Sequence, residues 1–447
     1  MNREQSTLDG HAKALTSIRI GEFGTGWRHH WQSARSSDFI VKVAETYLTR
    51  IFLMGLALVT TVVVARLLGP AGRGYYAVAA ATGALGVQFG NLGLHTSNTY
   101  FVAKYPESLP SLAGNTLAVS FGFGGLIALV LGIVFTVSPG LLGIGGATLL
   151  LALAWIPFGL AYTLTQNLLL GLQDVRGYNL AEILSKTLPL LLIGILVLTR
   201  HVGVASLFST MLVALIVSWL WIARRLQERS PGAVEVSTAV FRDTMGYAMK
   251  AYMAATFCFL VLRVDLFMVQ HMLGPEQAGY YSVASTMADY ASILAMVIGT
   301  ILFPKLSAAT DLRIKLALTR KATIGTGLIL LPLLIVASLL ARPAVRLLFG
   351  PSFLPASLAF ILLMPGMLFL GIHTVAVQFL NSIGYPKSVV IIWGLCTFFN
   401  IALNLWAIPH HGIAGASVVS SISYFLAFFF VMWVIYRTGR NAGMLAA

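Results

Sequence analysis

The sixteen residues 65–80, ARLLGPAGRGYYAVAA, return as residues 270–285, QHMLGPEQAGYYSVAS, at an offset of 205 residues. Eight of the sixteen positions are identical, including two glycines, one proline and a tyrosine pair in the same order. Each copy joins one long apolar segment to the next. A repeat of this length indicates that the chain consists of two copies of one structural unit.

The composition excludes a soluble protein. Of the 447 residues, 58% are hydrophobic and 10% are charged, whereas a soluble domain carries about 25% charged residues. The long apolar runs therefore predict transmembrane helices. The net charge of +14 does not indicate nucleic-acid binding, because the cations lie between apolar segments. Cys258 and Cys396 lie within apolar segments, so we interpret them as small buried hydrophobic residues rather than metal ligands or a disulfide.

We expect an all-α polytopic membrane protein with twelve transmembrane helices in two six-helix bundles. Six helices, an even number, separate the two copies of the repeat, so both copies enter from the same side, and a pseudo-two-fold axis along the membrane normal relates the bundles. The expected helices are 47–68, 75–102, 113–137, 142–170, 178–199, 203–223, 247–273, 279–304, 321–341, 355–382, 388–408 and 412–436. The expected parts are a polar cytoplasmic N-terminal segment (1–45), an N-terminal bundle (46–223), a cytoplasmic linker (224–246), a C-terminal bundle (247–437) and a cytoplasmic tail (438–447).

The distribution of cations predicts the orientation. With the N-terminus in the cytoplasm, the cytoplasmic segments hold 20 Lys and Arg residues and the opposite side holds 5. This bias predicts that both termini are cytoplasmic. Residues 1–45 lack an apolar core and so are not a cleaved signal peptide. Two interpretations of this segment stay open: a helix on the membrane surface near Trp27 and Trp31, or a disordered tail.

Ionisable residues within transmembrane segments are the first candidates for function, because they are costly there and need a partner or a cavity. Arg263 and Asp265 lie near the middle of the segment 247–273, and Asp289 lies near the middle of 279–304. Two residues apart on a helix, Arg263 and Asp265 face different neighbours. Arg263 is a candidate anion contact. Asp265 and Asp289 are candidates for proton or cation coupling, with ion pairing that fixes the packing as the alternative for each.

Two further charged groups are candidate ion pairs. Glu182 and Lys186 have the i, i+4 spacing of a pair on one helix. Glu45 aligns with Lys250 under the 205-residue offset, so these two charges are expected to pair across the bundles. Arg50 lies near Glu45 and is a second candidate for the substrate cavity. Extension of Arg50 and Lys250 to the cytoplasmic surface is the alternative for both.

A polar stripe is expected on the second helix. Gln88, Asn91, His95 and Asn98 are spaced by 3, 4 and 3 residues, which places them on one helical face. Such a stripe lines a polar cavity or forms hydrogen bonds to a neighbouring helix.

Several activities lack the residues they need. No glycine-rich loop with Lys and Ser/Thr is present for nucleotide phosphates, which argues against direct ATP drive. No Ser/His/Asp arrangement or His/Cys cluster has convincing spacing, and no long external loop could carry catalytic residues. We therefore expect neither an enzyme nor a cofactor nor a metal site.

The six-plus-six helices and the L-G-P-x-x-x-G-Y-Y turn resemble the polysaccharide (oligosaccharide) flippases of the multidrug/oligosaccharidyl-lipid/polysaccharide exporter superfamily. The segment from Arg263 to Tyr281 is the most specific part of this resemblance. It implies alternating access around a cationic cavity in the bacterial inner membrane. The implied substrate is an undecaprenyl-pyrophosphate-linked repeat unit, moved from the cytoplasmic to the periplasmic leaflet during polysaccharide biosynthesis. The glycan polymerase machinery of the periplasm is the implied partner.

The candidate residues fit this interpretation. Arg263 and Arg50 are the cations for a pyrophosphate, and the polar stripe is suited to uncharged sugar. Asp265 or Asp289 would carry coupling to a proton or sodium ion, although downhill flipping needs none. Two alternatives stay open: a cation-coupled drug antiporter of the same superfamily, which predicts a more acidic cavity, and a membrane glycan polymerase or ligase.

Overall fold

The computed structural model describes residues 37–141, 143–230, 234–384 and 387–441, with side chains from Phe52 onward except at 246–248, 250 and 251. The chain divides into two compact units, Met1–Met54 and Gly55–Ala447. Within the described residues every element is helical. Of the first unit, only the beginning of one helix is described. The predicted N-terminal segment 1–45 therefore lies mostly outside the described residues.

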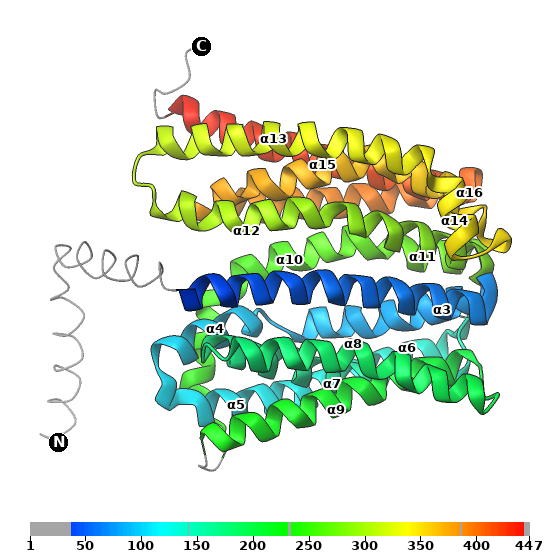
Figure 1. Ribbon diagram of the computed structural model, residues 1–447, viewed down its shortest axis with the longest axis horizontal. Coiled ribbons are helices and arrows are strands. Elements are labelled where there is room, and N and C mark those ends of the chain that lie inside the picture. The colour runs from blue at the N-terminus through cyan, green and yellow to red at the C-terminus, as the bar shows by residue number, and fades with distance from the viewer. Residues whose placement is uncertain (1–36, 142, 231–233, 385–386, 442–447) are drawn as a thin grey trace, which may run out of the picture. The chain divides into compact units, whose positions relative to one another are not determined.

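The helices of the second unit run side by side along one direction (Figure 1). Ten segments among the described residues are long and apolar enough to cross a membrane. In chain order the α-helices are α3 (Ser37–Gly90), α4 (Leu94–Lys104), α5 (Leu109–Leu117), α6 (Gly124–Val137), α7 (Gly146–Gly171), α8 (Val175–Leu198), α9 (Val204–Arg229), α10 (Thr238–Leu273), α11 (Pro275–Asp289), α12 (Ile293–Ala308), α13 (Leu312–Leu339), α14 (Ala341–Leu348), α15 (Ala356–Ser382) and α16 (Lys387–Asn441).

Two of the long helices are interrupted by a glycine. In α3 the backbone leaves the helical conformation at Gly69, and in α16 it does so at Gly412, with φ angles of 66° and 60°. Glycine adopts positive φ without the steric cost that other residues meet. The expected segments 47–68 and 75–102 lie on the two sides of Gly69, and 388–408 and 412–436 lie on the two sides of Gly412.

The expected helix 75–102 is wrong as a continuous helix. A turn at residues 91–93 separates α3 from α4, with φ angles of 50° at Leu92 and 77° at Gly93. Gly90, Asn91 and Gly93 are residues typical of turns, and they end the helix here. The Asn91 side chain accepts a hydrogen bond from the backbone N–H of His95 at 3.2 Å, which satisfies one donor in the first turn of α4.

The expected linker 224–246 is shorter in the structure. Helix α9 continues to Arg229, and α10 begins at Thr238, where the Ser237 side chain accepts from Val240 N at 3.4 Å. Charged residues such as Arg224 and Arg225 are good helix formers. The helices therefore continue past the apolar segment, and only 230–237 remain between them.

The helical array has two ends, which we name by their residues. The motif end holds the turns at Gly69–Pro70 and Gly274–Pro275, together with α14 and the turn between α8 and α9 (Figure 1). The basic end holds the turn between α12 and α13 and the C-terminus of α9. Cations at the basic end include Arg224, Arg225, Arg229, Arg313 and Lys315, whereas the motif end holds Arg66, Arg73, Arg200, Arg342 and Arg346.

Candidate functional site

The two repeated turns have the same backbone conformation. Gly69 has φ 66° and ψ −177°, and Gly274 has φ 87° and ψ 179°. Pro70 and Pro275 follow directly, and proline suits the first position of a helix because its missing N–H would have no partner there. Glycine and proline therefore form a helix–turn–helix reversal at both positions, as the repeat predicts.

The two turns pack against each other. A Cβ atom on Gly74 would overlap the carbonyl oxygen of Pro275, and a Cβ atom on Gly279 would overlap the carbonyl oxygen of Pro70. The contact is reciprocal, as between two surfaces related by a two-fold axis. The absence of side chains at Gly74 and Gly279 lets α3 and α11 approach to backbone contact at the motif end.

Their place next to the turn would suggest that the repeated tyrosines anchor the helices at the membrane surface. They are instead buried. Tyr76 is 4% exposed and Tyr281 is 1% exposed. The Tyr76 hydroxyl contacts the sulfur of Met211, and the Tyr281 hydroxyl lies 3.5 Å from the Ser420 hydroxyl. Met211 and Ser420 differ by 209 residues, the same offset that separates Gly203 from Gly412. Both halves thus direct this tyrosine to an equivalent place.

The environment of the repeated tyrosine differs between the halves, because among the described residues a buried carboxylate, Asp265, is present only beside Tyr281. The Asp265 carboxylate is 2% exposed and accepts hydrogen bonds from the Tyr281 hydroxyl and from Ser420 Oγ, the latter at 2.8 Å. Thr60 occupies the equivalent position under the 205-residue offset. The buried carboxylate is satisfied by donors from α11 and α16, so it joins three helices.

Arg263 turns to a different neighbour from Asp265, as a spacing of two residues on a helix requires. Its Nη2 donates to Oδ2 of Asp289 at 2.8 Å, with the two side chains 34% and 40% exposed. Asp289 is the last residue of α11, before the 3-10 turn Tyr290–Ser292. The pair therefore joins α10 to α11 at a bend and keeps polar atoms accessible near mid-span.

The expected polar stripe does not share one face, because the turn at residues 91–93 breaks the helix. Gln88 donates to Thr256 Oγ1 of α10 at 3.1 Å. Asn91 Nδ2 lies 2.8 Å from His95 Nδ1. Asn98, 2% exposed, donates to Thr116 of α5 at 2.9 Å. Hydrogen bonds to other helices and within the turn thus account for all four polar groups. His95 also borders an open hollow of about 650 Å³ together with Asn167 and Lys104.

The candidate pair Glu182 and Lys186 does not form an ion pair in the structure. Oε2 of Glu182 is buried and has no hydrogen-bond partner, while Lys186 is exposed. In the described part of the chain no ion pair joins these two residues. The side chains of Glu45, Arg50 and Lys250 lie outside the described residues, so their predicted roles stay predictions.

One charged cluster was not anticipated. Asp174, before α8, accepts from Arg225 Nε at 2.5 Å and lies 3.0 Å from Arg229 Nη2. It also caps α8 by accepting from Gly177 N at 3.0 Å. The hydrogen bond from Arg225 lowers the pKa of Asp174, although burial acts in the opposite direction. The cluster fastens the α7–α8 turn to α9 at the basic end.

Arg73 was also not singled out beforehand. It lies in the repeated turn beside Gly74 and is 7% exposed. Its Nε has no hydrogen-bond partner, and its guanidinium lies 5.5 Å from the centre of the Tyr76 ring. Among the described residues no carboxylate forms an ion pair with it.

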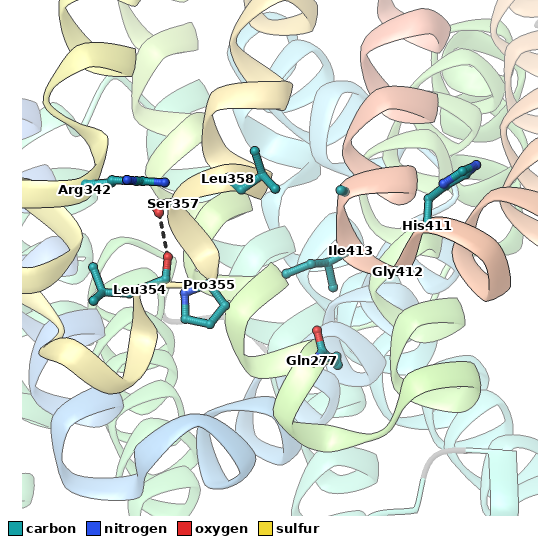
Figure 2. Close-up of a pocket in the computed structure, with 10 residues that line it drawn as sticks. Gln277, Arg342, Leu354, Pro355, Ser357, Leu358, His411, Gly412 and Ile413 are labelled. Carbon is teal, nitrogen blue, oxygen red and sulfur yellow. Dashed lines mark hydrogen bonds between the residues drawn. The ribbon is translucent and has the colours of Figure 1, made fainter.

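The motif end also carries an open hollow of about 530 Å³. Figure 2 shows Arg342 and Ser357 on one side of it and Gly412 and Ile413 on the other. All of its lining residues belong to α11, α14, α15, the short segment before α15 and the bend of α16. Neither Arg263 nor Asp289 borders it. Among the described residues no group of three or more His, Cys, Asp or Glu side chains is placed to hold a metal ion.

Comparison with known proteins gives a family match over most of the chain. The profile of a family described as polysaccharide biosynthesis protein matches residues 63–358. An uncharacterised membrane protein of Methanocaldococcus jannaschii is 24% identical over 237 residues, 52% of this chain and 47% of that protein. A putative O-antigen transporter of Shigella flexneri is 23% identical over 174 residues, 39% of this chain and 42% of that protein. The chain thus spans less than half the length of each of these relatives.

Solved structures show the fold. The lipid II flippase MurJ in an inward closed conformation superposes with a TM-score of 0.69 at 17% identity, over 87% of each chain. An inward-facing multidrug resistance MATE family transporter of the MOP superfamily gives 0.66 at 16% identity, over 88% of this chain and 96% of that one. At these identities the likeness concerns the helical fold alone.

Proposed function

Because the chain belongs to the polysaccharide biosynthesis protein family, we propose that it is a flippase for undecaprenyl-pyrophosphate-linked oligosaccharide repeat units. It moves them from the cytoplasmic to the periplasmic leaflet of the bacterial inner membrane. The family match and the helical fold support membrane transport. The substrate and its direction are the proposal.

The observation that carries the proposal is the accessible Arg263–Asp289 pair. A guanidinium near mid-span with 34% of its side chain exposed offers N–H donors to an anion within the membrane. Guanidinium groups bind phosphate oxygens in a bidentate manner. Since Asp289 neutralises Arg263 when no substrate is bound, the pair lowers the cost of holding the cation there.

Alternating access between two six-helix bundles is part of this proposal. The bends at Gly69 and Gly412 divide two of the ten long helices, which supports a total of twelve segments. The matching contacts of Tyr76 and Tyr281 support a two-fold relation between residues 46–223 and 247–437. The reciprocal packing of the repeated turns then closes the path at the motif end.

The orientation follows from charge. Arginines and lysines gather at the basic end, so we assign that end and both termini to the cytoplasm. The motif end then faces the periplasm. Figure 1 is consistent with this assignment, because α16 finishes at the end that holds the α12–α13 turn.

Asp289 is the better candidate for coupling than Asp265. The Asp265 carboxylate is almost fully buried and has donors from two helices. Asp289 is 40% exposed and holds Arg263. Binding of a proton to Asp289 would release the guanidinium for the substrate. The ionisable groups near mid-span are of mixed sign, with Arg263 beside Asp289, which disfavours the more acidic cavity expected of a drug antiporter.

Reconstitution tests the proposal. Purified protein in liposomes is supplied with a fluorescent lipid-linked oligosaccharide, and a membrane-impermeant quencher reports how fast the label changes leaflet. The proposal predicts exchange faster than in protein-free liposomes. Uptake of an organic cation without lipid exchange would identify an antiporter instead. Extension of the glycan by the purified protein would identify a polymerase.

A further inference from the structure

Arg73 is a buried cation that the architecture of the turn does not explain. The second copy of the repeat has Ala278 at the equivalent position, 0% exposed, and forms the same turn. Neither the reversal at Gly69 nor the close approach of Gly74 to Pro275 therefore requires an arginine. A neutral, small side chain serves the same fold in the other half.

Burial of the Arg73 Nε–H without an acceptor costs free energy, because the group loses water and gains no hydrogen bond in exchange. The Tyr76 ring at 5.5 Å offsets part of this cost through a cation–π contact. It accepts none of the hydrogen bonds that the planar guanidinium can donate. The site thus holds a positive charge and a buried N–H donor without an acceptor.

Tyr290 connects this place to the mid-span pair. Tyr290 follows Asp289 directly in the chain and interacts electrostatically with Arg73. The Arg263–Asp289 pair, Tyr290 and Arg73 therefore form a series of polar groups that leads from mid-span towards the motif end. The packed turns of Gly74 and Gly279 lie beside the outer member of this series.

We propose that Arg73 is a second anion-binding residue, which takes phosphate oxygens of the pyrophosphate headgroup after Arg263 and before release at the motif end. This inference rests on the proposed function. An anion at Arg73 supplies the missing acceptors and would be held beside the contact between Gly74 and Pro275. Separation of the two turns then exposes Arg73 to water, which solvates both ions and lets the headgroup leave.

Binding and transport are measured on the full chain with four variants. Arg73→Gln removes the charge, Arg73→Lys retains it, Arg263→Gln removes the mid-span cation, and Arg346→Gln removes an exposed cation of the motif end as a matched control. Inorganic pyrophosphate is the probe. Its effect on the thermal unfolding midpoint in detergent reports binding, and leaflet exchange in liposomes reports transport.

We expect Arg73→Gln to weaken the pyrophosphate effect, with about tenfold lower affinity, since a charge-assisted hydrogen bond is lost. Arg73→Lys retains part of the effect, and Arg346→Gln retains all of it. In the Arg263→Gln background the residual pyrophosphate effect disappears when Arg73→Gln is added. Leaflet exchange falls in Arg73→Gln and recovers partly in Arg73→Lys.

The inference is overturned if Arg73→Gln responds to pyrophosphate and transports as the wild type does, while Arg263→Gln is impaired. If Arg73→Gln does not fold, Arg73→Lys decides, and full loss of the pyrophosphate effect with the charge retained overturns it. Failure of the proposed function looks different, because the wild type then does not exchange lipid-linked oligosaccharide at all. Stabilisation by phosphate equal to that by pyrophosphate would identify a general anion site and overturn the headgroup assignment.

Discussion

Gly74 and Gly279 face each other across the motif end, each packed against the backbone of the turn that contains the other. The two residues hold equivalent positions in the repeat, 205 residues apart. A contact this close exists only because both residues lack a side chain. In a protein that alternates access, it forms a seal that separates when the motif end opens.

Alanine at either glycine is expected to force the turns apart. Gly74→Ala or Gly279→Ala should shift the equilibrium away from the closed motif end or lower stability, by about 1–3 kcal/mol as for other overpacked contacts. Reaction of an introduced motif-end cysteine with an impermeant thiol reagent, together with the unfolding midpoint, measures both effects. Gly194→Ala is the control, because a Cβ there meets nothing within 4 Å. Equal behaviour of all three variants would show that the turns do not form a seal.

Loss of the Tyr281 hydroxyl should destabilise the protein more than loss of the Tyr76 hydroxyl. Tyr281→Phe removes a donor from the buried Asp265 carboxylate, at a cost of about 1–3 kcal/mol, whereas Tyr76→Phe removes only a contact with a thioether. Thermal unfolding of the two variants in one detergent measures the difference. A larger loss for Tyr76→Phe would contradict the assignment of Asp265 as a joint between helices.

The stabilisation by Asp174 should depend on pH in a defined direction. Its pKa is lowered from the ordinary value of 3.8, first by the hydrogen bond from Arg225. The carboxylate therefore stabilises the fold fully above pH about 4, and this contribution is lost as the pH falls through the lowered pKa. We expect Asp174→Asn to lower stability by about 1–2 kcal/mol at neutral pH.

The difference in stability between wild type and Asp174→Asn should become smaller in acid. Unfolding midpoints measured from pH 7 downward test this. Glu228→Gln serves as the control, because its pair with Arg224 is exposed on both sides and should change little. A gap that is constant or widens below pH 4 would contradict the ion-pair cluster.

Replacement of Asp289 should strengthen anion binding. Asp289→Asn removes the carboxylate that pairs with Arg263. Pyrophosphate then no longer competes with this carboxylate for the guanidinium. We expect about tenfold tighter binding, with slower transport because the headgroup leaves Arg263 more slowly. Pyrophosphate titrations followed by thermal unfolding test the affinity. Unchanged affinity would show that Asp289 does not compete with the substrate.

Much of the fold is predictable from the sequence, since helices that cross a membrane have a strong apolar signal. The repeat itself predicts the paired bends at Gly69 and Gly274, because glycine and proline have direct backbone consequences. The break at residues 91–93 coincides with a turn signal, Gly90-Asn91-Leu92-Gly93, which the expected helix 75–102 passes over. Local sequence does not reveal which residues far apart in the chain meet.

The candidate site shows the same limit. Arg263 and Asp289 were identified because charges within apolar segments are rare. Their pairing was one of several options, and 26 residues separate them. The contact of Asp174 with Arg225 spans 51 residues, so neither residue stood out among the polar residues of the loops. The burial of Arg73 is not predictable from its own segment, because the turn that holds it packs against the other half of the molecule.

The central claim is that Arg263 contacts the headgroup of a lipid-linked oligosaccharide, and leaflet exchange in liposomes tests it most directly. The initial rate is compared among wild type, Arg263→Gln, and Arg263→Gln combined with Asp289→Asn, all at equal protein content. The double variant removes both charges, so a purely structural ion pair would leave transport intact. We predict a loss of about tenfold or more in both variants. Transport at the wild-type rate by the double variant would contradict the claim.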